Sequence, residues 1–83
     1  MEKYKSYGLS ERQRDIAIGM LDNGKTEEYP YSIKEVEDST LDAWISESEE
    51  TPYVQFLLDA KNSGAVVYTL LWEWQEIGEI AVY

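Results

Sequence analysis

The chain has 83 residues and no cysteine, so we expect a single domain, residues 1–83, without a disulfide framework. Apolar residues make up 43% of it, which argues against disorder despite a net charge of −10. Histidine is absent as well. The commonest general base near neutral pH and the cysteine nucleophile are therefore both missing, and we expect neither an enzyme nor a metal or cofactor site.

The first helix is predicted over residues 11–22. Ser10 and Gln13 have the spacing of a capping box, in which each side chain bonds the backbone N–H of the other residue. Apolar residues then recur at helical spacing, at Ile16, Ala17, Met20 and Leu21. Asn23-Gly24 is typical of a helix end, and residues 25–30 are predicted to form a loop.

A second helix is predicted to start at Ile33 and to run to residue 47. Ser32 and Glu35 repeat the capping-box spacing, and apolar residues again fall on one side of a helical wheel. Side chains near the middle of this segment compete for backbone hydrogen bonds and weaken the helix. The alternative is therefore two short helices with a break near Asp38.

A third helix is predicted after Thr51-Pro52, because a capping residue followed by proline is typical of a helix start. Its apolar face would consist of Tyr53, Phe56, Leu57 and Ala60. A strand over residues 53–59 is the alternative. Gly64 is predicted to close the helix.

The C-terminal part is predicted to form a β-hairpin. From Ala65 to Trp74 the residues alternate between two faces and are rich in β-branched and aromatic types, which indicates a strand. Gly78 is predicted to form the turn into a partner strand over residues 80–83. The expected fold class is α+β, with two or three short N-terminal helices packed on a C-terminal antiparallel β-hairpin or small sheet.

Negative charge is concentrated between residues 27 and 50. Nine acidic residues and a single lysine lie there, so this stretch carries −8 of the chain's −10. Such a surface repels nucleic acid and anionic membranes and attracts basic protein surfaces. We therefore expect a basic, nucleic-acid-binding protein as partner, and no direct contact with nucleic acid or membrane.

The chain also lacks the marks of an exported or membrane protein. No stretch approaches the ~20 apolar residues that cross a bilayer, and the first residues lack the apolar core of a signal peptide. Small secreted domains usually depend on disulfides, which this chain cannot form. A cytoplasmic protein is the resulting expectation.

The acidic residues would share one helix face if residues 33–50 formed a single helix. The four carboxylates on that face would be Glu35, Asp38, Asp42 and Glu49. They would be spaced so that they meet every second or third phosphate position of a basic groove. Five more acidic residues would support them: Glu27, Glu28, Glu37, Glu47 and Glu50. The alternative is an ordinary solvated helix face.

Seven tyrosines and three tryptophans exceed what a core of this size readily buries. Three aromatic residues of the C-terminal strand are predicted to lie in the core: Tyr68, Trp72 and Trp74. Those predicted to be exposed are Tyr4, Tyr7, Tyr29 and Tyr31. The last two flank Pro30 beside the acidic stretch, and aromatic rings next to carboxylates suit an arginine-rich partner.

Our leading hypothesis is a small acidic protein that inhibits a nucleic-acid-binding protein by occupying its basic site. In size, charge and lack of catalytic residues, the chain resembles the small acidic inhibitors and DNA mimics carried by phages and mobile elements. One alternative is an antitoxin- or immunity-type inhibitor of a basic enzyme, anchored by Tyr29 and Tyr31. Another is an assembly module whose strand 65–74 pairs edge to edge with a second copy in a homodimer.

Overall fold

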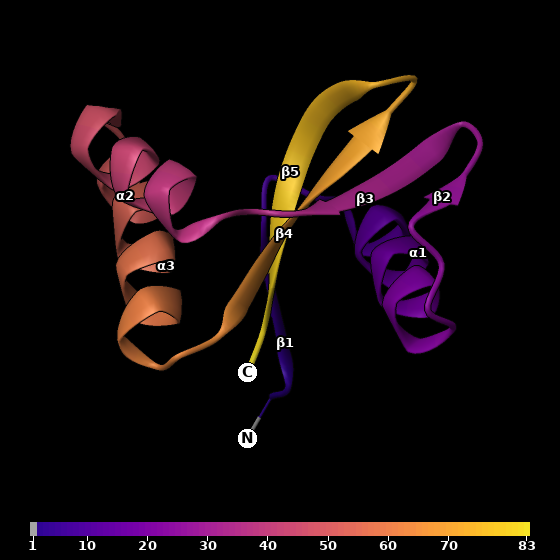
Figure 1. Cartoon of the computed structure of the whole chain (residues 1–83), viewed down its shortest axis with the longest axis horizontal. Helices are drawn as coiled ribbons and strands as arrows, with labels where there is room; N and C mark the ends of the chain where they lie inside the picture. The colour runs from indigo at the N-terminus through magenta and orange to yellow at the C-terminus, as the bar shows by residue number, and fades with distance from the viewer. Residues whose placement is uncertain (1) are drawn as a thin grey trace.

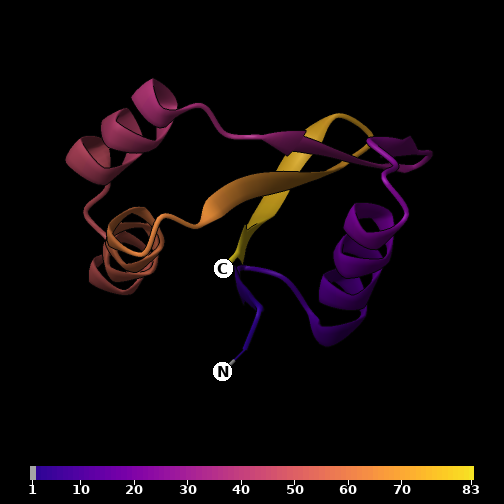
Figure 2. The ribbon, with the colours of Figure 1, turned by 60° about the horizontal axis from the view of Figure 1, so that its bottom comes forward.

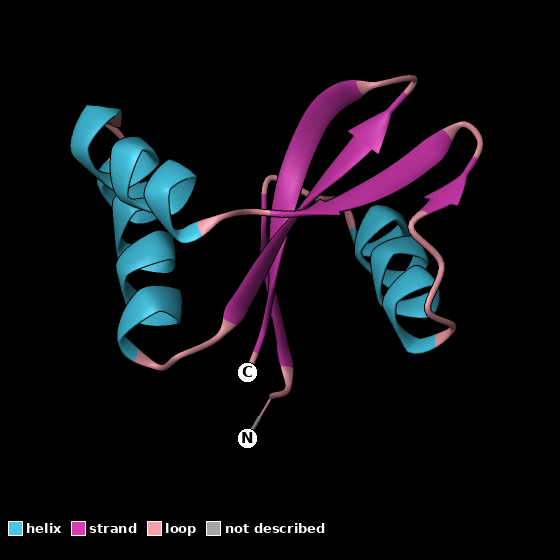
Figure 3. Ribbon diagram, in the orientation of Figure 1, coloured by secondary structure: helices cyan, strands magenta, loops and turns pink. Residues whose placement is uncertain are grey.

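In the computed structural model, which describes residues 2–83, five antiparallel strands form one sheet and three helices cover it (Figures 1 and 3). In chain order the elements are β1 (Tyr4–Tyr7), α1 (Glu11–Asp22), β2 (Glu27–Glu28), β3 (Tyr31–Glu35), α2 (Asp38–Glu47), α3 (Thr51–Asn62), β4 (Val66–Trp72) and β5 (Gln75–Val82). The strand order across the sheet is β1-β5-β4-β3-β2. The predicted α+β class is confirmed, but the helices are not all N-terminal, because strands precede α1 and separate it from α2.

The sheet lies between two helical layers, and each face has its own hydrophobic cluster (Figure 2). The cluster beneath α1 contains the buried residues Ala17, Met20, Ile33, Leu70 and Ile80. The cluster beneath α2 and α3 contains Val36, Leu41, Leu57, Ala60, Val67 and Ala81. Because side chains of a strand point alternately to opposite faces, β4 contributes Leu70 to the first cluster and Val67 to the second.

Helix α1 has the bounds and the cap predicted from the sequence. Ser10 Oγ accepts a hydrogen bond from the Gln13 backbone N–H at 3.2 Å, and Gln13 Oε1 accepts one from the Ser10 N–H at 2.9 Å. The Asn23 N–H caps the last turn, and Gly24 then takes a left-handed φ of +69°. Local side-chain chemistry is therefore enough to define this helix.

The predicted helix start at Ile33 is wrong, because residues 31–35 form strand β3. Ile33 pairs with Leu70 of β4 and is 5% exposed beneath α1. Ser32 is buried in the sheet and caps no helix. Pairing with β4 thus overrides the capping-box spacing, and α2 begins only at Asp38. The break predicted near Asp38 is real, but the segment before it is a strand.

The third predicted helix is confirmed, and the alternative strand over residues 53–59 is wrong. Helix α3 starts at Thr51, with Pro52 in its first turn, so Glu50 and not Thr51 is the N-cap residue. Its apolar face packs on the second cluster through Tyr53, Phe56, Leu57 and Ala60, as expected. Gly64 follows the helix with a φ of +71°.

The C-terminal hairpin forms, but its turn is at Glu73 and Trp74, which have φ values of +48° and +70°. Gly78 lies inside β5, beside a break in the pairing register with β4 at Leu70/Leu71. On its other side β5 pairs with β1, a strand that the sequence patterns did not indicate. A Cβ at Gly78 would lie 2.8 Å from the Tyr7 carbonyl oxygen and 2.5 Å from Leu9 Cδ2. This glycine is therefore required by the close approach of β1 and Leu9.

A matched pair of glycine substitutions tests this packing. Gly78→Ala should lower the free energy of unfolding by about 1–3 kcal/mol, because the backbone of Tyr7 would have to move. Gly19→Ala, in the interior of α1 with nothing within 4 Å of its Cβ, should raise it by about 0.5–1 kcal/mol. Urea unfolding of both variants measures these changes. Equal effects of the two substitutions would contradict the tight β1–β5 contact.

Candidate functional site

The most strongly charged part of the molecule is the segment 35–50, which we call the acidic segment. It contains seven acidic residues and no basic one, and each of the seven is exposed. The segment comprises the end of β3, all of α2 and the connection to α3. Its charge is not offset within the segment, so its surface attracts positive groups.

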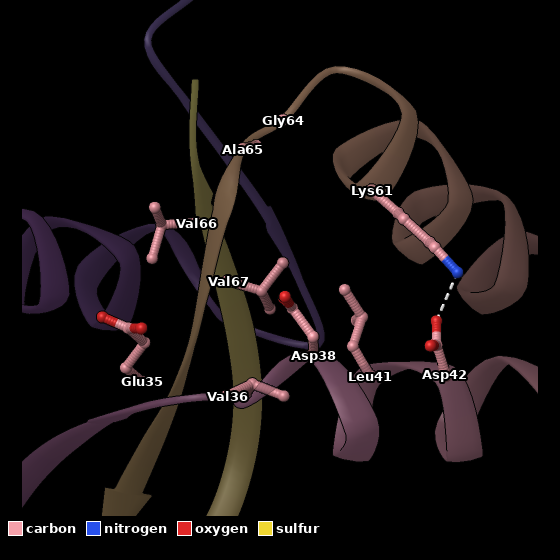
Figure 4. A pocket seen from close by; sticks show the side chains of 10 residues that line it. All are labelled: Glu35, Val36, Asp38, Leu41, Asp42, Lys61, Gly64, Ala65, Val66 and Val67. Atoms are coloured by element: carbon pink, nitrogen blue, oxygen red, sulfur yellow. Dashed lines mark hydrogen bonds and ion pairs between the residues drawn. The ribbon is translucent and has the colours of Figure 1, made fainter.

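Three of the four carboxylates predicted for the binding face lie around one groove. Glu35, Asp38 and Asp42 line an opening of about 450 Å³ between the first turns of α2, the end of α3 and the start of β4, with Glu35 across β4 from the two aspartates (Figure 4). The rest of its lining is largely aliphatic, from Val36, Leu41, Ala65, Val66 and Val67. The groove therefore combines carboxylates with apolar surface.

Lys61 of α3 forms an ion pair with Asp42 at this groove (Figure 4). Within residues 2–83, it is the one ion pair that reaches the groove. Glu35 and Asp38 therefore keep their negative charge available, whereas that of Asp42 is shared with a lysine that is itself half exposed.

The predicted linear array of four carboxylates is wrong, because residues 33–50 are not one helix. Glu35 lies on a strand, and α2 ends at Glu47. Glu49 lies beyond it, in the connection to α3, and is not part of the groove. The regular spacing that would have matched a phosphate backbone does not exist, although the acidic residues remain exposed.

The supporting acidic residues lie on several elements. Glu27 and Glu28 form the edge strand β2, and Glu28 Oε2 lies 3.7 Å from Lys25 Nζ in an ion pair. Glu37 is the N-cap residue of α2, Glu47 ends that helix, and Glu50 precedes α3. Of the five supporting residues, Glu37, Glu47 and Glu50 therefore lie in the acidic segment, and Glu27 and Glu28 do not.

A second concave acidic site was not predicted. Glu50, Glu76 and Glu79 line a small opening near the start of β5, together with Tyr7 and Tyr53. The Tyr7 hydroxyl donates to Glu50 Oε2 at 3.3 Å. Glu79 was missed because its burial depends on the pairing of β5 between β1 and β4, for which no local pattern exists.

Glu79 is 8% exposed, and this burial raises the pKa of its carboxyl group. A hydrogen bond from the Tyr53 hydroxyl acts in the opposite direction, and the charge of Glu76 adds to the increase. Burial, followed by the contact with Glu79, also raises the pKa of Tyr53. Tyr53 and Glu79 thus connect α3 to β5, and the carboxylate of Glu79 is poorly solvated.

Glu79→Gln is predicted to increase stability at neutral pH. Since the pKa of Glu79 is higher in the folded than in the unfolded state, the folded state binds more protons, and stability falls as pH rises through that pKa. Glutamine keeps an acceptor for Tyr53 but carries no charge. The stability gain in urea unfolding should be largest at pH 7 and should shrink as the pH is lowered. A stability difference between the variant and the native chain that does not change with pH would contradict the raised pKa of Glu79.

The predicted burial of Trp72 and Trp74 is wrong. Trp72 and Trp74 are 41% and 62% exposed, because Trp72 ends β4 and Trp74 lies in the hairpin turn. Tyr68 packs on the cluster beneath α1 as predicted. Tyr29 is 71% exposed as predicted, and Tyr31 is partly buried with its ring 4.8 Å from that of Trp72.

Tyr4 and Tyr7 are partly buried, not fully exposed. The Tyr4 hydroxyl donates to Asp22 at 2.5 Å, and the Tyr7 ring packs on Tyr53 and Phe56. These two tyrosines therefore connect elements of the fold.

Strand 65–74 has no free edge for pairing with a second copy. β4 lies between β3 and β5 and is paired on both sides. The edges of the sheet are β1 and β2, of four and two residues. The predicted dimerisation through this strand is therefore wrong, since both sets of its backbone groups are already paired.

No protein-family model, curated protein or solved structure matches this chain. Within residues 2–83, no helix has both the length and the apolar character needed to cross a bilayer. The same residues include no group of three potential ligands placed to hold a metal ion. The chemistry of the exposed surfaces is what remains to indicate a function.

Proposed function

We propose that the protein is a small acidic inhibitor that occupies the basic, nucleic-acid-binding surface of a partner protein. The observation that carries this proposal is the acidic segment: seven exposed carboxylates over residues 35–50 without a basic residue among them. An ordinary solvated surface carries charges of both signs. A segment of one sign instead favours a partner of the opposite sign.

One acidic residue of the segment, Glu47, destabilises its own helix. Asp38 lies in the first turn of α2, where the helix dipole favours negative charge, and the charge of Asp42 is offset by its ion pair with Lys61. Glu47 lies in the last turn, where the helix dipole disfavours negative charge, and that turn contains no basic residue. Solubility alone would not require an acid at the end of α2, so the presence of Glu47 there supports a binding role.

The groove suits the side chains with which proteins hold phosphate. Arginine pairs with carboxylates through a planar fork of N–H donors, and both arginine and lysine have apolar stems. In the groove, Glu35 and Asp38 would take the place of phosphate oxygens. The aliphatic lining, which includes the 40% exposed Val66, would contact the stem.

This function predicts that binding depends on the acidic segment. The triple variant E35Q/D38N/D42N should bind basic nucleic-acid-binding proteins about tenfold more weakly at 0.1 M salt, because three carboxylates lose their charge. The native chain and the variant are immobilised, exposed to a nuclease-treated bacterial lysate and eluted with a salt gradient. The retained proteins should leave the variant at lower salt.

The matched control is E2Q/E11Q/D15N, which removes the same charge from three exposed residues outside the segment. It should retain the same proteins as the native chain. A retained protein is then tested for loss of nucleic-acid binding on addition of the native chain. Equal elution from both triple variants, or a partner that keeps its nucleic acid, would overturn the proposal.

A further inference from the structure

The turns of the two hairpins β2–β3 and β4–β5 together expose a group of aromatic side chains. We call this surface the aromatic tip, and it consists of Tyr29, Tyr31, Trp72, Glu73 and Trp74. Both turns lie at the same end of the sheet (Figure 1). Of the four large hydrophobic side chains that are exposed among residues 2–83, three belong to it: Tyr29, Trp72 and Trp74. The tip is a hydrophobic surface that no described element of the chain covers.

Contacts between the two turns hold the aromatic tip in place. The Glu73 N–H donates to the Pro30 carbonyl oxygen at 2.8 Å, and the Tyr29 hydroxyl donates to Glu73 Oε1 at 3.2 Å. Tyr31 and Trp72 are direct cross-strand partners whose rings meet edge to face. The rings of Tyr29, Tyr31 and Trp72 are therefore held in place before any partner arrives, which reduces the entropy lost on binding.

The sequence of the β4–β5 turn is poor for folding. Glu73 and Trp74 both have positive φ, a conformation for which two-residue hairpin turns normally use Asn-Gly or Asp-Gly. Trp74 is 62% exposed, so it contributes little to the core. Neither turn geometry nor core packing accounts for a tryptophan there, and residues kept in strained conformations often serve function.

The charge around the aromatic tip identifies the kind of partner. Glu27, Glu73 and Glu76 lie on or next to the two turns. Lys25 shares an opening with the two tyrosines of the tip, but its charge is offset by Glu28, whose Oε2 lies 3.7 Å from Lys25 Nζ. Anionic partners are therefore repelled. A second copy of this chain is disfavoured as well, because it carries the same tip and a net charge of −10.

We propose that the aromatic tip is a docking site for an arginine-bearing segment of a protein partner. A guanidinium group can stack on the exposed Trp74 or Trp72 ring while its N–H groups bond the Glu73 carboxylate. Lysine lacks the planar group and is more strongly hydrated, so it fits less well. The tip shares no residue with the acidic segment, so this inference does not rest on the proposed function.

Titration with a hexa-arginine and a hexa-lysine peptide tests the proposal. The native chain should bind the arginine peptide about two- to fivefold more tightly for each stacked guanidinium. In ¹⁵N-correlated NMR spectra, the indole N–H signals of Trp72 and Trp74 should shift more than that of Trp44, which packs in the core of the α2–α3 face. Equal affinities for the two peptides, or shifts confined to the acidic segment, would overturn the proposal.

Two variants separate the tip from the fold and from the acidic segment. E73N/W74G installs a favourable hairpin turn, so its midpoint of thermal unfolding should rise while its preference for arginine over lysine decreases about two- to fivefold for each stacked guanidinium. E35Q/D38N/D42N should bind both peptides more weakly but keep that preference. An E73N/W74G variant that is folded and prefers arginine as strongly as the native chain would overturn the proposal.

Discussion

The fold depends on two central strands, because β5 and β4 each contribute side chains to both hydrophobic clusters and each pair with a strand on either side. Strand β5 does so through Ile80 and Ala81. The alternating side chains of β4 place Leu70 beneath α1 and Val67 beneath α2 and α3. Strand β4 also holds β3 and β5 on either side. In a chain of 83 residues each cluster is small, so neither helical layer has a large core of its own. The acidic segment and the aromatic tip both owe their positions to β4, since α2 follows β3 and the β4–β5 turn follows β4 directly.

The sequence was informative where structure is determined locally and misleading where distant pairing decides. Ser10 with Gln13 and Ser32 with Glu35 show the same capping-box spacing, yet only the first pair starts a helix. Ile33 has a partner in Leu70, and that pairing is not visible within the segment itself. The start of α3 could be predicted from Pro52, and the C-terminal hairpin from the alternation of side chains after Ala65. Strand β1 could not be predicted, because its edge pairing with β5 joins the two ends of the chain.

The candidate site was predicted by residue type more successfully than by geometry. The acidic residues are exposed as expected, and Glu35, Asp38 and Asp42 lie around one groove. Their predicted linear spacing failed together with the single helix. The exposure of Trp74 could not be predicted, because the turn at Glu73 and Trp74 contains neither glycine nor asparagine. Residues that disagree with their local structure in this way are often those under functional constraint.

The pairing of β1 with β5 has a consequence for how the molecule folds during synthesis. Tyr4 lies opposite Val82, so the sheet cannot be completed until nearly all 83 residues have left the ribosome. Until β4 and β5 are complete, α1, α2 and α3 lack the two strands that contribute buried side chains to both hydrophobic clusters, and contacts of such long sequence separation form slowly. During this interval the strong negative charge already present between residues 27 and 50 keeps nascent chains apart.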